Sequence, residues 1–333
     1  MNESIDRVYR TVTADRGDAR RRLDRTIQRH LLTSEHPATR ARVQRWIASG
    51  FVTVNGAPTL RPAARTMIGD VVTIRLPAGD TPAPRPAVAA EEATLDILYE
   101  DEHLLAVNKP AGLVVHPTYK HARGTLLNAL LWHARDWTAP ARPSLVGRLD
   151  RRTSGLLLVA KSARVHATLQ RALASPAAEK DYLALVYGRL PTARGTIDLR
   201  LRRDPADRRR MVASPAIGAP SVTEFERLAR LRASRVHLTL VRCRLRTGRT
   251  HQVRVHLAAR DCPIVGDPVY GEARWRDVDD PALADLLRTC DRQALHAWRL
   301  VFPHPANGRR VAIEAPLPAD MARLLGALGY SGT

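Results

Sequence analysis

One acidic residue, set between arginines and followed at once by an apolar run, constrains this chain more than any other feature. Asp150 lies in the polar segment 147–153, and the apolar run 156–160 begins directly after a glycine at position 155. A short apolar run bounded by a turn predicts a buried strand. A carboxylate at the mouth of such a strand, surrounded by cations, stays ionised and can be directed at a substrate. On spacing alone, however, an ordinary surface ion pair is the simpler explanation.

Residues 147–161 resemble the catalytic motif of the RluA-type pseudouridine synthases. Further segments resemble the same family in the same order: residues 99–117, 180–188, 246–257 and 263–271. Together they span most of residues 95–317, and their common order argues against coincidence. The resemblance implies an enzyme that isomerises uridine to pseudouridine in RNA and needs neither a cofactor nor a metal.

The resemblance also assigns a catalytic group. It implies that Asp150 acts on the bond between uracil N1 and ribose C1′, as nucleophile, as base or as stabiliser of positive charge on the sugar. It implies that Arg249 pairs with Asp150 and keeps it ionised, with phosphate contact alone as the alternative. Tyr182 is implied to pack on the uracil and is a candidate for removing the C5 proton. The alternative for Tyr182 is a place in a strand core.

Neighbouring residues receive weaker assignments. Arg148 could hold the phosphate that flanks a flipped nucleotide, or form a structural ion pair. For His251 and Gln252, support at the start of a helix is favoured over a direct catalytic role. Two positions depart from the family pattern. Gly147 stands where the family commonly has His, which leaves the mode of base extrusion open, and Arg152 stands where it usually has an acid.

The charge of the chain indicates a polyanionic partner. Its 333 residues carry 53 basic and 33 acidic side chains, for a formal charge of +20. Compositional bias explains why arginine outnumbers lysine, but it does not explain the excess of base over acid. We therefore expect RNA as the partner. Hydrophobic residues make up 44%, enough for a sizeable core.

No metal, disulfide framework or membrane span is expected. The three cysteines have no metal-ligand spacing and their odd count fits a reducing compartment. His251 and His256 are five residues apart, which is poor spacing for two ligands on one helical face. The polar N-terminus shows no secretory signal, and no apolar run reaches membrane-spanning length. We expect a cytoplasmic monomer.

The N-terminal third predicts a small separate domain. Residues 1–20 are polar and are expected to form a flexible tail. Residues 21–76 predict two helices followed by a hairpin that turns at Asn55-Gly56. This layout resembles the S4 RNA-binding domain. The resemblance implies that the second helix lies along RNA phosphates through Arg40, Arg42 and Arg45, although solvated charges on an exposed face are the alternative.

A Pro- and Ala-rich stretch, residues 77–94, predicts a semi-extended linker. Residues 95–330 then form the expected catalytic domain. Strands are predicted around 104–107, 182–187, 237–245, 295–302 and 310–314, and helices around 125–133, 162–173 and 321–328. The fold class is α+β with a mixed, largely antiparallel sheet. The central cleft is implied by the resemblance rather than by periodicity.

Within the family, an N-terminal S4 domain usually accompanies large-subunit ribosomal RNA as substrate, so we favour that RNA. Two alternatives stay open. The first is the same chemistry on tRNA, and the second is a noncatalytic RNA-binding or ribosome-assembly factor that keeps the fold. Asp150, Tyr182 and Arg249 occurring together argues against the second, because a factor without activity need not retain all three.

Overall fold

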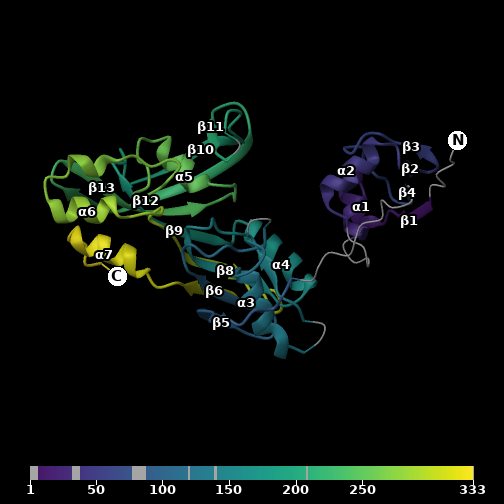
Figure 1. Cartoon of the computed structure of the whole chain (residues 1–333), viewed down its shortest axis with the longest axis horizontal. Helices are drawn as coiled ribbons and strands as arrows, with labels where there is room; N and C mark the ends of the chain where they lie inside the picture. Colours follow the sequence, from purple (N-terminus) through teal and green to yellow (C-terminus); the bar gives the residue numbers. More distant parts are fainter. Residues whose placement is uncertain are drawn as a thin grey trace. The chain divides into compact units, whose positions relative to one another are not determined.

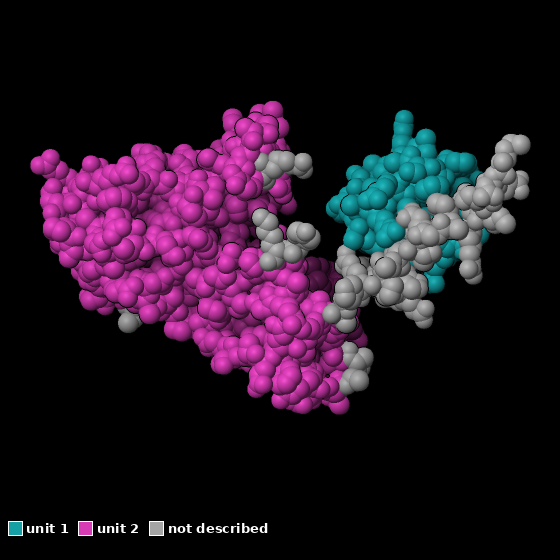
Figure 2. Space-filling model, viewed as in Figure 1, with its two compact units in different colours: residues 1–87 teal, residues 88–333 magenta. Residues whose placement is uncertain are grey.

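The protein consists of two compact units. A computed structural model describes residues 7–31, 38–76, 88–118, 121–138, 141–207 and 209–332. The units are Met1–Ala87 and Val88–Thr333, coloured separately in Figure 2. Of the predicted linker, residues 77–87 lie outside the described residues. Its last part is attached to the second unit, because the backbone N–H of Glu91 donates to the carbonyl of Asn128 at 3.1 Å.

The first unit packs two helices on one four-stranded antiparallel sheet (Figure 1). Its elements are β1 (Arg7–Thr13), η1 (Arg16–Asp18), α1 (Leu23–Leu31), α2 (Arg40–Ala48), β2 (Val52–Val54), β3 (Ala57–Pro58) and β4 (Val71–Leu76). Thr39 caps α2 by accepting the N–H of Arg42. Asn55 and Gly56 have φ of 51° and 82°, the left-handed pair that a tight hairpin needs. Both predicted helices and the hairpin are confirmed.

The prediction of a flexible tail over residues 1–20 is wrong from Arg7 onward, where strand β1 begins. β1 pairs with β4 from Arg7↔Leu76 to Thr13↔Val71. The sequence hides this strand because its side chains are mostly polar: Val12 is buried, whereas Val8 is 50% exposed. Backbone hydrogen bonds with β4 hold the strand in place, and such bonds leave no pattern in the side chains. Residues 1–6 lie outside the described residues.

The second unit is built on one eleven-stranded sheet in the order β11-β10-β12-β13-β9-β14-β8-β6-β5, with β15 beside β14 and β7 beside β8. Every pairing is antiparallel except the parallel contact of β14 with β8. The strands are β5 (Ile97–Glu100), β6 (Leu104–Lys109), β7 (Ser144–Val146), β8 (Ser154–Ala160), β9 (Glu179–Tyr187), β10 (Arg194–Arg203), β11 (Met211–Ser214), β12 (Ala219–Ala233), β13 (Val236–Leu245), β14 (Leu295–Pro303) and β15 (Arg310–Glu314). The predicted mixed, largely antiparallel sheet is confirmed.

The helices of this unit are α3 (Leu126–His133), α4 (Ala163–Ala174), α5 (Gln252–Ala258), α6 (Pro281–Arg288) and α7 (Ala319–Ala327), with single turns η2 (Ala134–Asp136) and η3 (Arg274–Asp277). In Figure 1, α3 and α4 lie with β5, β6 and β8 at one end of the sheet, and α5 and α6 lie with β12 and β13 at the other. Among the described residues, no helix combines the length and the apolar character that a membrane span requires.

Strand β8 runs through the centre of the second unit, and all seven of its residues are buried, as the apolar run predicts. It lies between β6 and β14. Gly155 has φ of 110°, and a Cβ there would lie 2.2 Å from the carbonyl oxygen of Ala297. Only glycine permits this approach, so the segment that carries Asp150 enters the sheet directly beside β14.

Candidate active site

The turn between β7 and β8 carries Asp150, and several neighbouring segments hold it in place. The N–H of Thr153 donates to the carbonyl of Asp150 at 3.0 Å, which closes the turn. The Thr153 hydroxyl accepts a hydrogen bond from Gln293 at 3.0 Å. The buried Nζ of Lys109 donates to the carbonyl of Arg151 at 3.0 Å. The backbone that follows Asp150 is therefore held by its own turn, by Gln293 and by Lys109.

The carboxylate of Asp150 is paired with Arg254. The Nη1 of Arg254 lies 2.9 Å from Oδ2 of Asp150. The Nε and Nη2 of Arg254 donate to both oxygens of Asp267, each at 2.7 Å. The side chain of Arg254 is only 5% exposed and that of Asp267 is not exposed. A guanidinium that donates two hydrogen bonds to a buried carboxylate is held in one orientation. Its Nη1 is then directed at Asp150.

The predicted pairing of Arg249 with Asp150 is corrected by this arrangement. Arg249 is exposed, and its Nε donates to the carbonyl of Pro220 at 3.2 Å. The backbone explains the difference. Arg249 lies in the exposed loop before α5, whereas Arg254 lies within α5, which is buried along nearly its whole length. Arg249 nevertheless lines the same cavity as Asp150, so the two residues share a site without forming a pair.

A groove opens beside Asp150 within the second unit. Its inner part is a cavity of about 60 Å³ with apolar walls from Leu149, Leu245, Val253 and Leu295. The wider groove has a volume of about 580 Å³ and adds segment 246–251, Lys180 and part of β8. Apolar side chains next to a carboxylate suit a pyrimidine ring whose sugar faces the charge.

Tyr182 lies on β9 and lines both the cavity and the wider groove. Burial raises the pKa of its phenol, and the negative charge of Asp150 raises that pKa further. Among the described residues, none forms a hydrogen bond with its hydroxyl. Tyr182 is thus a neutral ring in the groove, placed for stacking on a base.

The loop that leads into α5 is held by Gln252. Its Oε1 accepts from the Thr247 hydroxyl and the Arg249 N–H, and its Nε2 donates to the carbonyl of Val222 and the hydroxyl of Thr223. The predicted support at a helix start is confirmed for Gln252. His251 is the N-cap residue of α5, and its carbonyl accepts the N–H of Val255 at 2.9 Å, so it begins the helix as predicted. Its side chain makes no capping hydrogen bond and lines the groove, with Nε2 3.7 Å from Oδ2 of Asp150.

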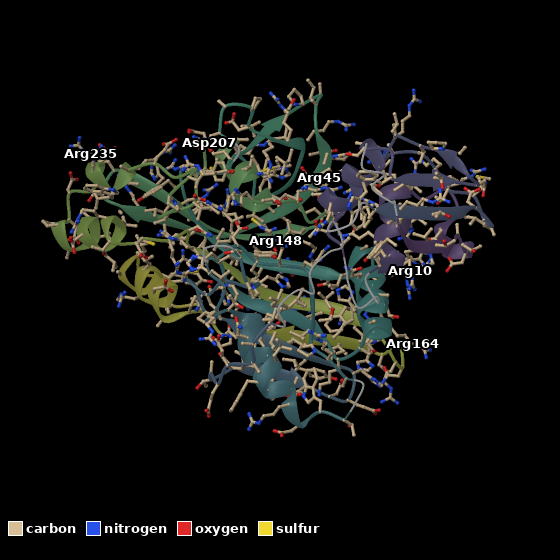
Figure 3. The ribbon with its side chains drawn as sticks, turned by 45° about the vertical axis from the view of Figure 1, so that its right-hand side comes forward. Arg10, Arg45, Arg148, Arg164, Asp207 and Arg235 are labelled. Atoms are coloured by element: carbon tan, nitrogen blue, oxygen red, sulfur yellow. The ribbon has the colours of Figure 1, made fainter. Side chains whose placement is uncertain are left out.

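Two arginines at the mouth of the groove have exposed guanidinium groups. Arg148 and Arg249 are both exposed and line the groove. Figure 3 labels Arg148 among the side chains over the middle of the second unit. Within the described part of the chain, Arg148 forms no hydrogen bond or ion pair. Exposed guanidinium groups around a cavity are the expected partners of phosphates.

In the first unit, the structure separates the three arginines that sequence reasoning grouped on α2. Arg40 donates to the buried carboxylate of Asp24 at 3.0 Å, so it stabilises the fold of this unit. Arg42 lies over the ring of Trp46, with its Cζ 5.8 Å from the ring centroid. Arg45 is exposed and forms no ion pair with any described residue. Of the three, Arg45 presents its charge most openly.

One trio in the described residues, Asp15, Asp18 and His30, has its side-chain oxygens and nitrogen close enough together for a metal ion. It lies in the first unit. Arg29 forms ion pairs with both carboxylates, at 2.7 and 2.8 Å, so the protein itself supplies a cation to this cluster.

Sequence reasoning missed Arg254 and Asp267. Both lie in segments that carry the family resemblance, at 246–257 and 263–271, so their importance was signalled but their roles were not. The spacing of five residues between Arg249 and Arg254 does not say which of them faces Asp150. That depends on the placement of α5, which contacts β10, β11 and β12.

Comparison with known proteins agrees with this geometry. Residues 103–259 match the model of the RNA pseudouridylate synthase family. The chain is 40% identical over 309 residues to the RNA pseudouridine synthase YlyB of Bacillus subtilis, covering 92% of this chain and 95% of that protein. It is 43% identical over 290 residues to ribosomal large subunit pseudouridine synthase D of Nitrosomonas europaea, covering 87% of this chain and 80% of that protein.

Solved structures show the same fold. Human RNA pseudouridylate synthase domain containing 4 aligns with a TM-score of 0.55 at 24% identity, covering 70% of this chain and 92% of that one. Human RNA pseudouridylate synthase domain containing 1 aligns with a TM-score of 0.52 at 26% identity, covering 72% and 96%. With the carboxylate, the buried guanidinium and the tyrosine gathered at one groove, this chain belongs to the RluA-type group of the RNA pseudouridine synthases.

Proposed function

We propose that this enzyme isomerises uridine in large-subunit ribosomal RNA, with Asp150 as its catalytic carboxylate and without a cofactor. The observation that carries the proposal is the contact of Asp150 with Arg254, which is itself fixed by Asp267. Through this contact, one oxygen of Asp150 is bound to Arg254, and the carboxylate lies in a groove whose size and polarity suit a pyrimidine nucleotide. The alternative of a noncatalytic factor gives no reason for such an arrangement.

The reaction breaks the N1–C1′ bond and forms a C5–C1′ bond, while the proton on C5 is lost and N1 gains one. No electron enters or leaves, so no redox group is required. Positive charge develops at C1′ as the first bond breaks. Asp150 and Asp267 carry two negative charges against one positive charge on Arg254, which leaves one negative charge to face the sugar. A bond from Asp150 to C1′ and purely electrostatic stabilisation both use this charge.

Tyr182 is assigned to the uracil ring. Burial and the negative charge of Asp150 raise the pKa of its phenol, which makes the phenolate that would remove the C5 proton harder to form. Stacking uses the face of the ring and does not depend on ionisation. The structure therefore favours Tyr182 as the stacking residue of the two roles considered from the sequence.

The choice of RNA rests on two observations. Several relatives, including those from Nitrosomonas europaea and Pseudomonas aeruginosa, bear the name ribosomal large subunit pseudouridine synthase D. The basic residues Arg148, Arg249 and Arg45 are exposed where phosphates can reach them. We assign the first unit, as an S4-like domain, to RNA binding through Arg45 and Arg42. Such a substrate places the enzyme where ribosomal RNA is processed, in the cytoplasm.

The test compares wild-type protein with Asp150→Asn on transcripts of large-subunit ribosomal RNA and on tRNA. Pseudouridine is mapped at single-nucleotide level after incubation with purified protein. The expected result is modification of ribosomal RNA by the wild type, none by Asp150→Asn, and full activity of the control Asp136→Asn, whose side chain is 79% exposed. Modification confined to tRNA would overturn the substrate, and equal activity of Asp150→Asn would overturn the role of the carboxylate.

A further inference from the structure

A second set of contacts, through Tyr270 and His251, leads from β11 to the neighbourhood of Asp150. The backbone N–H of Met211, on β11, donates to the hydroxyl oxygen of Tyr270 at 2.8 Å. That hydroxyl lies 2.8 Å from Nδ1 of His251. The other ring nitrogen of His251, Nε2, lies 3.7 Å from Oδ2 of Asp150.

One assignment of the protons satisfies every group in this arrangement. The Tyr270 oxygen accepts the Met211 N–H, and because the described residues offer the Tyr270 hydroxyl no other acceptor, its own proton goes to Nδ1 of His251. An imidazole that accepts at Nδ1 carries its proton on Nε2 when it is neutral. Burial lowers the pKa of His251, with Asp150 and Asp267 acting in the opposite sense and Arg254 and Arg148 adding to the effect. The neutral ring with an Nε2 proton facing Asp150 is the consistent state.

The backbone of His251 is also unusual. Its φ of 56° and ψ of 19° lie in the left-handed region, where a residue other than glycine is uncommon. The side chain makes no cap for α5. Strain at a residue that points into a groove is a recurring mark of a functional position.

We propose that His251 is a positioning residue for the pseudouridine reaction, its tautomer set by Tyr270, and that its Nε2 proton acts with Arg254 to hold Oδ2 of Asp150. Both donors then act on one oxygen. No described residue donates a hydrogen bond to Oδ1, so that oxygen is the one presented to the sugar. The gap of 3.7 Å is slightly longer than a hydrogen bond and is of the kind that closes when substrate binds.

This inference rests on the proposed function, since it assigns a residue to the same site. Its first test is therefore independent of activity. In nitrogen-15 NMR of the full chain, the wild type should show His251 as the Nε2-protonated neutral tautomer near pH 7. Tyr270→Phe keeps the ring but removes the proton donor, and should shift His251 toward the Nδ1-protonated form. An Nδ1-protonated His251 in the wild type would overturn the proposal.

The second test uses turnover. His251→Asn tolerates the left-handed backbone but has no group at the position of Nε2. It should lower kcat by about 100-fold, the effect of removing one oriented donor, without weakening RNA affinity. Tyr270→Phe should lower kcat less, and the double variant should be no slower than His251→Asn because both changes break the same set of contacts. His237→Gln, outside the groove, is the control.

The outcomes separate the two proposals. If the wild type forms no pseudouridine, the proposed function is wrong, and the NMR result still decides which tautomer His251 adopts. If the wild type is active and His251→Asn is equally active, the proposed function stands and only the role of His251 is wrong. Equal losses of kcat and RNA affinity in His251→Asn, or additive losses in the double variant, would indicate a general structural role and would also overturn it.

Discussion

The ammonium group of Lys109 donates to the carbonyl oxygen of Arg151 at 3.0 Å, across 42 positions of sequence. The same Nζ donates to the carbonyls of Pro110 at 2.7 Å and Leu113 at 3.2 Å. Lys109 is fully buried, and its three donors match three carbonyl acceptors. It therefore ties the turn after β6 to the turn that carries Asp150.

Replacing Lys109 by Met should destabilise the protein and slow turnover. The new side chain has a similar length but leaves buried carbonyls without donors, which costs about 3 kcal/mol in unfolding free energy. The turn of Asp150 would also lose a support. Urea unfolding and single-turnover kinetics measure the two effects. Lys161→Met is the matched control, because Lys161 is partly exposed and pairs with Glu100 outside the groove. Unchanged stability of Lys109→Met would contradict the assignment.

Replacing Asp267 by Asn should reduce catalysis although residue 267 does not touch the groove. The guanidinium of Arg254 would lose a bidentate ionic partner, and its orientation toward Asp150 would become less defined. A displacement of about 1 Å at a reacting group can cost about 100-fold in rate. Single-turnover rates on saturating RNA measure this. Asp261→Asn, which affects a carboxylate 87% exposed and paired with Arg274, should leave the rate unchanged. A wild-type rate for Asp267→Asn would show that Arg254 needs no second anchor.

The secondary structure of the site was predictable where one face of an element is apolar. The apolar run at β8 and the alternation of apolar and polar residues at β13 were both predicted correctly as strands, because buried positions are mostly apolar. The long β10 was not predicted. Its second half alternates the apolar residues Ile197, Leu199 and Leu201 with charged ones, so the sequence carried a strand signal that the prediction did not use.

Contacts between segments were not predictable. Arg249 and Arg254 belong to the same resembling segment and have the same chemistry, and only the placement of α5 decides between them. That placement depends on Gln252, whose four hydrogen bonds reach β12 and the preceding loop. The pairing of Arg254 with Asp267 likewise joins two segments through space. Sequence periodicity carries no such long-range information.

Arg254 and Arg249 should give opposite phenotypes. Arg254→Gln removes the cation beside Asp150, so the rate at saturating RNA should fall by at least about 100-fold with little change in affinity. Arg249→Gln should weaken RNA binding and reduce the salt dependence of the binding constant by about one unit of slope, because one phosphate contact is lost. Filter binding over a range of salt concentrations and single-turnover rates distinguish them. A large rate loss with unchanged affinity in Arg249→Gln would restore the pairing predicted from sequence.

Arg45 and Arg40 lie on the same helix and should also differ. Arg45→Gln removes an exposed charge from α2, so RNA affinity should fall and the salt slope should decrease by about one. Arg40→Gln breaks an ion pair with the buried Asp24, so the main effect should be a lower unfolding midpoint of the first unit. Fluorescence of Trp46, buried in that unit, follows the unfolding. Equal RNA affinity of Arg45→Gln and wild type would remove α2 from the RNA-binding surface.

Acid should destabilise the second unit through two buried histidines. Burial lowers the pKa of His256 and of His296 from 6.5 to about 4. Because the unfolded chain then binds more protons than the folded chain between these values, stability falls as pH drops from 6.5 toward 4 and levels off below that. Each histidine accounts for about 3 kcal/mol over this range.

His296 offers the cleaner test of this acid sensitivity. Its Nδ1 lies 3.0 Å from the Ser154 hydroxyl on β8 and its Nε2 lies 3.4 Å from the carbonyl of Ala315, so the ring is held inside the buried part of the sheet. Urea unfolding at pH 7 and pH 5 should show a smaller loss of stability on acidification for His296→Gln than for the wild type, whatever the stability of the variant at pH 7. The control is His121→Gln. His121 is exposed, and this variant should lose as much stability between pH 7 and pH 5 as the wild type does. An identical pH dependence in wild type and His296→Gln would mean that His296 titrates alike in the folded and unfolded chains, against the effect of its burial.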